Sequence, residues 1–244
     1  MSLQADESTI EMSVRNVFRT IRAVIFDLDG VLIDSAACHR AAFEEIFRPL
    51  GIDAFDYARY AGWRTADVVE SVLRAAANTV QPELIREMAA NKSRIAREKL
   101  AAANPVAPDC VAVLEALSRH YALALASSGS RQSVELFLAA NRCASLFGSV
   151  LSGDDVEHAK PAPEIYTRTF QALGVAPADG VIVEDAVAGI LAAKGAGAGM
   201  VIGFADNSQA GQLLSAGADL VIQTLSELPG LLCATYESAN ADRN

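Results

Sequence analysis

Four short polar segments of this 244-residue chain hold the kinds of side chain that phosphoryl transfer needs. They carry Asp27 and Asp29, Ser127 and Ser128, Lys160, and Glu184 with Asp185. Carboxylates gathered within a few ångströms repel one another and take up protons unless a cation joins them. Mg²⁺ prefers oxygen ligands supplied by few protein groups, whereas a lysine and hydroxyl groups suit a phosphate. We therefore predict a Mg²⁺-assisted phosphoryl-transfer site, in which a carboxylate can act as the nucleophile.

The elements that must position these segments follow an α/β pattern. Short apolar runs alternate with segments of helical periodicity, which is typical of a doubly wound (Rossmann-like) parallel sheet with crossover helices. The predicted strands are Ala23–Phe26, Tyr121–Ala126, Ser149–Leu151, Val181–Val183, Met200–Gly203 and Leu220–Ile222. Ligands of such sheets bind outside the carboxyl ends of the strands. The four polar segments map to those ends, so we expect them to converge on one crevice.

One region interrupts the alternation of strands and helices. Its apolar spacing is helical throughout, with a helix start at Thr65, another at Pro82 and a helix stop at Gly51. We predict an all-helical cap domain inserted into the α/β core after the first strand. The expected bounds are 1–20 for an N-terminal arm, 21–37 and 106–235 for the core, 38–105 for the cap, and 236–244 for a C-terminal tail.

Composition limits the classes of partner. The net charge of −10 disfavours nucleic acids and anionic membranes, because both require clustered Lys and Arg. No uncharged run approaches the roughly 20 residues that span a bilayer. The first sixteen residues mix acids with polar side chains and lack a hydrophobic signal core, so we expect a cytoplasmic protein. A small phosphorylated metabolite remains compatible with this charge, since a metal and a few local cations can reverse the potential inside one cleft.

The segments "DLDGVLIDS", "ALASSGS", "AKPAPEIY" and "VEDAVAGI" resemble the four ordered motifs of the haloacid dehalogenase-like phosphotransferase superfamily. The resemblance runs from about Ile21 to Cys233, and the helical insertion resembles the cap that this superfamily carries after its first motif. A single D-x-D-G is a modest signal, whereas four motifs in order are highly specific. His39 lies ten residues after Asp29, as does the linker histidine of the β-phosphoglucomutase-like and sugar-phosphatase branch.

The resemblance implies a role for each polar residue. Asp27 would attack phosphorus and form an aspartyl-phosphate, and Asp29 would protonate the leaving oxygen and then activate water. Ser127 and Lys160 would hold the phosphoryl oxygens, with Ser128 beside them. The implied ligands of Mg²⁺ are Asp27, the backbone carbonyl of Asp29, Asp185, and Glu184 either directly or through water. The two aspartates of the first motif must then differ, one metal-bound and ionised and the other able to hold a proton.

Each assignment has a plainer alternative. Asp27 and Asp29 could form a solvated turn, the serines could cap the next helix, and Lys160 could lie on the surface. His39 is either a hinge between cap and core, which we favour, or a proton carrier. The stretch Gly62, Trp63, Arg64 and Thr65 either lines the leaving-group side of the site or packs within the cap.

Among functions, we favour a Mg²⁺-dependent phosphatase acting on a sugar or polyol phosphate. An isomerase resembling β-phosphoglucomutase would share the core residues, but that mutase has a Lys before its cap-loop Gly and an Arg three positions after it. Here those positions hold Ala61 and Thr65, which favours hydrolysis. The dehalogenases of the superfamily lack the second Asp, so Asp29 argues against that chemistry. A non-catalytic phospho-accepting module remains a further alternative, although a long helical insertion is better explained as a lid.

Overall fold

A six-stranded parallel sheet forms the centre of the computed structural model, which describes residues 21–53, 55–76 and 80–232. Its strands are β1 (Ala23–Phe26), β2 (Ala122–Ala126), β3 (Phe147–Leu151), β4 (Gly180–Glu184), β5 (Met200–Phe204) and β6 (Leu220–Ile222). Their order in the sheet is β3-β2-β1-β4-β5-β6, and every pairing is parallel. This is the strand order of a doubly wound sheet, so the predicted fold class is confirmed. The predicted arm and tail lie outside the described residues.

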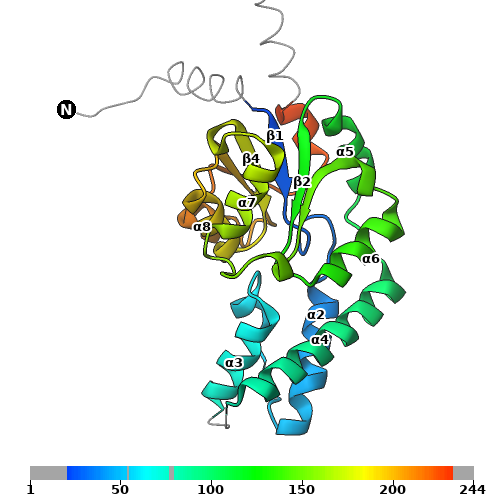
Figure 1. Cartoon of the computed structure of the whole chain (residues 1–244), viewed down its shortest axis with the longest axis vertical. Coiled ribbons are helices and arrows are strands. Elements are labelled where there is room, and N and C mark those ends of the chain that lie inside the picture. Colours follow the sequence, from blue (N-terminus) through cyan, green and yellow to red (C-terminus); the bar gives the residue numbers. More distant parts are fainter. Residues whose placement is uncertain (1–20, 54, 77–79, 233–244) are drawn as a thin grey trace, which may run out of the picture.

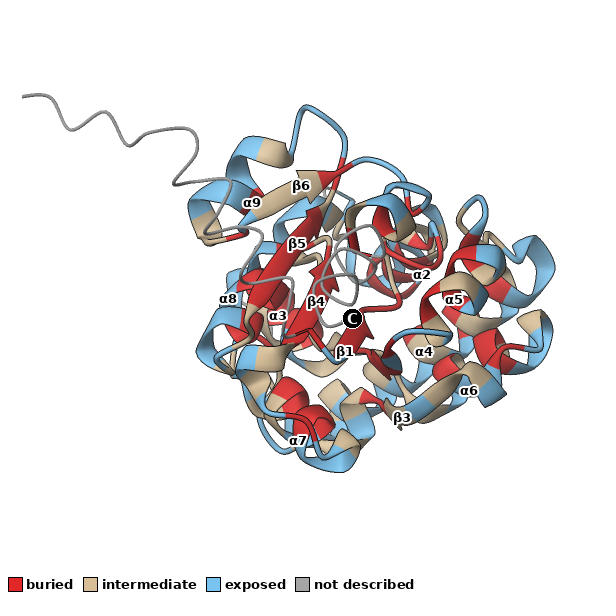
Figure 2. Cartoon of the chain, turned by 90° about the horizontal axis from the view of Figure 1, so that it is seen from above, coloured by how far each residue is buried: buried red, intermediate tan, exposed pale blue. Residues whose placement is uncertain are grey.

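Alternate residues of each central strand supply two separate cores, one on each face of the sheet. Val24 and Phe26 pack with α5 (Cys110–Ser118) and α6 (Arg131–Asn141). Ile25 packs on the other face, whose covering helices are α7 (Glu164–Leu173), α8 (Val187–Gly195) and α9 (Ala210–Ala216). Because both faces are covered, β1 is buried along its whole length and reads as a continuous apolar run. Figure 2 shows the buried residues concentrated in β1, β4 and β5, with β6 less buried at the edge.

The cap is a helical lobe with a core of its own (Figure 1). It contains α2 (Ala36–Phe47), α3 (Thr65–Ala75) and α4 (Pro82–Ala103), with short 3-10 turns at η1 (Arg48–Leu50) and η2 (Tyr57–Tyr60). Helices α2 and α3 both pack against α4. The aromatic rings of Phe43 and Phe47 lie 5.8 Å apart and form part of this core. We propose 38–105 as the bounds of the cap, which the chain enters after β1.

Strands β2, β4 and β5 differ from their predicted bounds by one residue at one or both ends, and two differences are larger. The edge strand β3 begins at Phe147, two residues before the predicted start, because Gly148 interrupts the apolar run and glycine weakens a strand pattern. The helical pattern predicted through Leu50 ends as an α-helix at Phe47 and continues as the η1 turn to Gly51, whose φ is +70°. Leu50 is consequently 42% exposed and does not join the cap core. Among the described residues, none of the helices has the length and apolarity needed to cross a bilayer.

Candidate active site

The first, second and fourth strands of the chain end side by side and place their polar residues at one edge of the sheet. Asp27 follows β1, and its backbone N–H donates to the carbonyl of Val183 in β4 at 3.0 Å. Ser127 follows β2, Glu184 is the last residue of β4, and Asp185 comes next. Convergence at this edge follows from parallel pairing, because neighbouring parallel strands end on the same side. Three of the four polar segments are therefore brought together by the sheet itself.

Lys160 joins this group from the loop before α7. Its ammonium group donates to Asp27 Oδ1 and to Glu184 Oε1, both at 2.6 Å, and to the carbonyl of Ala126 at 3.3 Å. The side chains of Lys160, Asp27 and Glu184 are 2%, 8% and 1% exposed. A buried lysine would ordinarily lose its proton, but the two carboxylates hold the pKa of Lys160 well above its usual value despite burial. Lys160 is therefore a permanent cation, and the surface alternative is excluded.

Three carboxylates form the one acidic group that could hold a metal ion within the described part of the chain. One oxygen each from Asp27, Glu184 and Asp185 lies within 4.8 Å of the others. Burial and the neighbouring carboxylates raise the pKa of Asp27 to about 8, even though Lys160 acts in the opposite direction. Burial and Glu184 likewise raise the pKa of Asp185 well above its usual range. An all-oxygen donor set with surplus negative charge fits a hard divalent cation.

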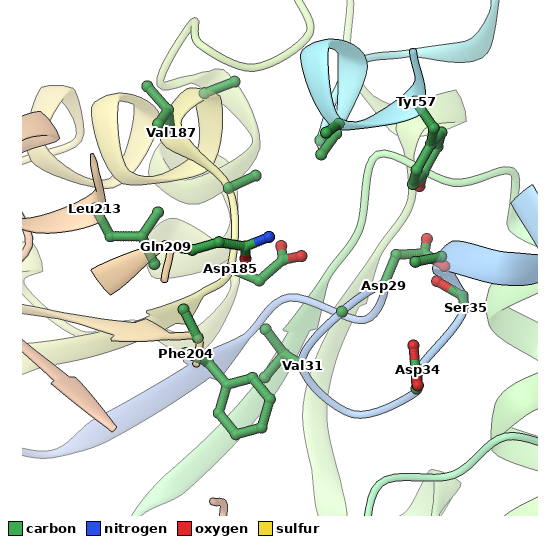
Figure 3. A pocket seen from close by; sticks show the side chains of 18 of the residues that line it. Asp29, Val31, Asp34, Ser35, Tyr57, Asp185, Val187, Phe204, Gln209 and Leu213 are labelled. Carbon is green, nitrogen blue, oxygen red and sulfur yellow. The ribbon is translucent and has the colours of Figure 1, made fainter. Parts of the chain in front are cut away.

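The loop after β1 leaves room for this group because it turns at a glycine. Gly30 has a φ of +83°, and a Cβ at this position would lie 1.9 Å from Asp185 Oδ2. Any other residue would therefore displace the Asp185 carboxylate. Figure 3 shows Asp185 on one side of the cleft floor and Asp29 on the other, with the side chain of Gln209 directed toward Asp185.

Glu184 is the most heavily hydrogen-bonded member of the acidic group. Its Oε1 accepts from Lys160 and, at 2.5 Å, from the hydroxyl of Tyr166. Its Oε2 accepts from the backbone N–H groups of Asp185 at 3.1 Å and Ala186 at 3.3 Å. A Cβ on Gly189 would lie 1.9 Å from this carboxylate, so α8 also approaches it closely. These four donors occupy both Glu184 oxygens, whereas the described residues give Asp185 no such set of donors.

Asp29 points away from the acidic group and toward the cap. Its Oδ1 lies 2.7 Å from His39 Nε2, and His39 Nδ1 lies 2.8 Å from the ammonium group of Lys92 in α4. Burial would raise the pKa of Asp29, but the charge of His39 and its hydrogen bond outweigh burial and lower it below its usual range. This arrangement favours the ionised form of Asp29, and its role as the group that protonates the leaving oxygen stays a prediction.

The segment after β2 contributes a buried hydroxyl. Ser127 is fully buried, and its Oγ accepts from the backbone N–H of Gly129 at 2.9 Å. A Cβ on Gly129 would lie 3.1 Å from that Oγ and 3.5 Å from Asp29 Oδ2, so this turn is closely fitted beside Asp29. The hydroxyl of Ser128 donates instead to the carbonyl of Gly62 in the cap at 3.0 Å. Ser128 therefore connects core to cap, and its hydroxyl is not free for phosphate here.

The predicted cap stretch divides between two locations. Gly62 and Trp63 line a cleft of about 1390 Å³ between cap and core, whereas Arg64 and Thr65 do not. Arg64 donates to the carbonyls of Val156 at 2.9 Å, Glu157 at 3.2 Å and Gly153 at 3.3 Å in the core. Thr65 is the first residue of α3. That Arg64 and Thr65 line the leaving-group side stays a prediction; in this arrangement the Arg64 guanidinium reaches core carbonyls.

Sequence reasoning missed several residues of the site. Lys92 is 4% exposed, although lysine is ordinarily a surface residue. Its one sequence signal is position, since Lys92 lies between Met88 and Ile95 on the apolar stripe of α4. Tyr166 likewise occupies the buried stripe of α7, and its hydroxyl supplies the fourth donor to Glu184. A polar group within an apolar stripe requires a partner, and that requirement could have identified both residues.

Comparisons with known proteins show the family to which the chain belongs. Residues 24–202 match the sequence profile of the haloacid dehalogenase-like hydrolases, so the chain belongs to that family. It is a phosphoric monoester hydrolase. Its relatives include phosphatases named for phosphorylated carbohydrates and for fructose 1-phosphate. Hydrolases of this family generally use a divalent metal ion, and the acidic group of Asp27, Glu184 and Asp185 could hold one.

Individual relatives cover nearly the whole chain. The chain is 32% identical over 225 residues to protein CbbY of Cereibacter sphaeroides, covering 86% of this chain and 95% of the relative. It is also 32% identical over 216 residues to validoxylamine A 7'-phosphate phosphatase of Streptomyces hygroscopicus subsp. limoneus, covering 85% and 95%. The crystal structure of β-phosphoglucomutase from Clostridium difficile has a TM-score of 0.78 with 24% identity, covering 91% and 99%. At that identity the likeness to the mutase shows the fold alone.

Proposed function

We propose that the protein is a Mg²⁺-dependent phosphatase that hydrolyses a small phosphorylated sugar or polyol through an aspartyl-phosphate on Asp27. The observation that carries this proposal is the contact of Asp27 with Lys160 at 2.6 Å, beside the carboxylate of Asp185. Lys160 compensates the charge of Asp27 and leaves it a nucleophile at the carboxyl end of β1. The sugar-phosphate class is supported by relatives such as validoxylamine A 7'-phosphate phosphatase. We also infer a cytoplasmic location, on the sequence argument alone.

The proposed carboxylate ligands of the metal follow from which carboxylates the described residues leave without a full set of hydrogen bonds. Asp27 and Asp185 would hold Mg²⁺ together with the backbone carbonyl of Asp29. Glu184 already accepts four hydrogen bonds, so we assign it to ordering Lys160 and the backbone after β4, with contact to the metal through water. When bound, Mg²⁺ would neutralise the carboxylates and offset charge on the phosphoryl oxygens.

The proposed reaction has two displacements. A carboxylate oxygen of Asp27 forms a bond to phosphorus as the bond from phosphorus to the ester oxygen breaks. The released alkoxide oxygen takes a proton, which the Asp29–His39 pair holds across its 2.7 Å contact. Water then attacks the aspartyl-phosphate, Asp29 accepts its proton, and phosphate and the Asp27 carboxylate are regenerated. Lys160 and Ser127 would position the phosphoryl oxygens through both steps.

The mutase alternative differs only in what attacks the aspartyl-phosphate: a second sugar hydroxyl or water. The cap loop supports water. Ala61 and Thr65 supply no cation at the two positions where the mutase has them, and Arg64 is bound to core carbonyls. The cap loop of this chain therefore lacks the two cations that the loop of the mutase carries.

The experiment is a phosphate-release screen over sugar and polyol phosphates with and without Mg²⁺. We expect release that requires Mg²⁺ and that falls at least a thousandfold in Asp27→Asn. Asp53→Asn is a matched control, because Asp53 is exposed on the cap and outside the cleft. Activity that survives Asp27→Asn would remove Asp27 as nucleophile. Conversion of β-glucose 1-phosphate to glucose 6-phosphate without free phosphate would favour the mutase.

A further inference from the structure

The cleft between cap and core extends well beyond the acidic group. Its volume of about 1390 Å³ exceeds the roughly 300–1,000 Å³ of ordinary small-ligand pockets. The acidic group accounts for the phosphoryl group alone. The remaining lining must therefore face the part of the substrate that leaves, and its chemistry indicates what that part carries.

Exposed apolar side chains gather in this cleft. Five large hydrophobic side chains are exposed among the described residues. Three of them, Trp63, Val187 and Leu191, line the cleft and are between 41% and 46% exposed. The other two, Leu50 and Leu214, lie outside it. Single exposed apolar residues are ordinary on a protein surface, whereas a group of them that shares one hollow indicates a binding site.

Helix α8 carries two of these residues on its outward face. Val187 and Leu191 are four residues apart, so they are neighbours on one side of the helix. The opposite side supplies the buried Ala192 and Ala193 to the core. A helix that covers a sheet ordinarily has polar residues on its outward face. Packing against the sheet therefore does not explain the apolar pair.

The apolar pair begins close to the acidic group. Val187 follows Asp185 by two residues, which span at most about 7 Å, and one helical turn to Leu191 adds about 6 Å. Figure 3 shows Val187 on the same side of the cleft as Asp185, together with Phe204 and Leu213. A leaving group that extends from a phosphoryl group at Asp185 along this wall thus meets Val187 first and Leu191 further on.

The cap places its tryptophan beside the first turn of α8. A Cβ on Gly62 would lie 2.8 Å from the Cβ of Ala186, so the cap loop abuts the residue before Val187. Trp63 is the next residue of that loop. Its ring packs edge-on against Tyr60, with 5.7 Å between the ring centroids. An aromatic ring supported in this way is a preorganised apolar surface for a ligand.

The core wall around the apolar pair carries little charge. Among its lining residues from 186 to 223, Asp206 is the one charged side chain. Its carboxylate accepts from the N–H of Ser208 at 2.8 Å and from the Ser208 hydroxyl at 2.6 Å. Gln209 and Gln212 add neutral amide groups, which can donate to and accept from hydroxyl groups. This wall therefore suits a group that is uncharged.

We propose that Val187, Leu191 and Trp63 form an apolar subsite, which selects phosphate esters whose leaving group carries an uncharged apolar portion. This inference rests on the proposed phosphatase function and names its substrate class. The two residues of α8 supply aliphatic surface from the core, and Trp63 supplies an aromatic ring from the cap. Removal of this surface from water on binding provides the selection.

The test compares ethyl phosphate and hexyl phosphate as competitors of p-nitrophenyl phosphate hydrolysis in the presence of Mg²⁺. The two esters have the same charge and differ only in apolar length. We expect hexyl phosphate to inhibit at least tenfold more strongly, because its chain reaches the subsite and each buried methylene favours binding. This preference should fall below threefold in Val187→Thr with Leu191→Gln, whereas inhibition by ethyl phosphate should stay within twofold of the wild type.

Leu214→Gln is the matched control, because Leu214 is an exposed leucine outside the cleft, and it should keep the wild-type preference. Trp63 provides a second measurement, since it is the single tryptophan of the chain. Hexyl phosphate should protect the fluorescence of Trp63 from quenching by acrylamide, and ethyl phosphate should not.

Equal inhibition by the two esters, a preference unchanged in the double variant, or a Trp63 that hexyl phosphate leaves unprotected would overturn the subsite. The two proposals fail separately. Absence of Mg²⁺-dependent p-nitrophenol release would refute the phosphatase function, whereas release with equal inhibition by the two esters refutes the subsite alone.

Discussion

The contact between Lys160, Asp27 and Glu184 is the chemical centre of the site. One buried cation lies 2.6 Å from each of two buried carboxylates. Such an arrangement gives little net stability as a whole, but loss of one member leaves an uncompensated buried charge. The loss of Lys160 would therefore destabilise the fold, and the same cation keeps Asp27 usable as a nucleophile. Stability and activity both depend on this one side chain.

Lys160→Met should lower the free energy of unfolding by about 3–5 kcal/mol, because it leaves Asp27 and Glu184 buried together without their cation. Lys194→Met is the matched control. Lys194 is 42% exposed and paired with Asp219, so its loss should cost no more than about 1 kcal/mol. Urea unfolding of both variants measures the difference. An equal loss of unfolding free energy in the two variants would show that Lys160 does not compensate the charge of Asp27 and Glu184.

Lys92 provides a second prediction at the residue scale, on pH dependence. Burial lowers the pKa of Lys92 to about 8 in the folded protein, although Asp29 acts in the opposite direction. Between pH 8 and the unfolded value of 10.5 the unfolded chain therefore binds more protons, and the free energy of unfolding rises with pH. The rise contributed by Lys92 is at most about 3 kcal/mol.

The check is urea unfolding of wild type and Lys92→Met at several pH values from 7 to 10. The difference between the two proteins should shift steadily in favour of the wild type across this range. Lys99→Met, on the same helix and paired with Glu45 at the surface, is the control for losing a lysine from α4. A difference between wild type and Lys92→Met that does not change with pH would mean that Lys92 is not buried as described.

At the scale of elements, turns and loops set those distances between site residues that the pairing of strands does not fix. The strand ends bring Asp27, Ser127 and Asp185 to one edge of the sheet. The close approach of the loop after β1 to the Asp185 carboxylate depends on Gly30. Substitution of Gly30 by another residue has two separate costs. The new residue would have to adopt a positive φ, and its Cβ would also meet the Asp185 carboxylate.

Gly30→Ala and Gly174→Ala separate those two costs. Both glycines have a positive φ, but a Cβ on Gly174 would meet nothing within 4 Å. Each variant should lose about 1–2 kcal/mol of stability from backbone strain. Only Gly30→Ala should also lose Mg²⁺ affinity, measured by calorimetric titration, because its Cβ displaces the Asp185 carboxylate. Normal Mg²⁺ binding by Gly30→Ala would place the metal elsewhere.

The cap loop is the second element with a consequence for function. Arg64 and Ser128 connect the loop to the core through four hydrogen bonds, three of them from the Arg64 guanidinium. Gly62 allows this approach, because a Cβ there would lie 2.8 Å from that of Ala186. We therefore expect Arg64 to fix how the cap sits over the cleft and not to touch the substrate.

Arg64→Lys keeps the charge but loses the planar set of donors, so the loop should loosen. Trp63 is the single tryptophan of the chain, next to Arg64, and reports on the loop directly. In Arg64→Lys we expect acrylamide to quench the fluorescence of Trp63 more strongly than in the wild type, and we expect KM to rise severalfold. Arg74→Lys, in an exposed pair with Glu70 on the same helix, should leave both unchanged. Unchanged quenching in Arg64→Lys would contradict the assignment.

At the scale of the whole molecule, the sequence predicts what depends on local apolar pattern. The bounds of β1 and β6 and the start of α4 at Pro82 agree with prediction, because apolar runs and helix-start signals are local. The contact between Lys92 and His39 joins positions 53 residues apart, and no local pattern encodes it. The partners of Arg64 were not predicted for the same reason, since they lie about 90 residues further along the chain.

The whole account depends on Asp27 receiving the phosphoryl group, and rapid quenching tests this most directly. Wild-type protein is mixed with Mg²⁺ and a substrate from the screen, quenched in acid within milliseconds, and digested for peptide mass mapping. The account predicts an acid-stable, hydroxylamine-sensitive phosphoryl group on the peptide containing Asp27, and none in Asp27→Asn. A phosphoryl group on Ser127, or turnover in which the Asp27 peptide is never modified, would contradict it.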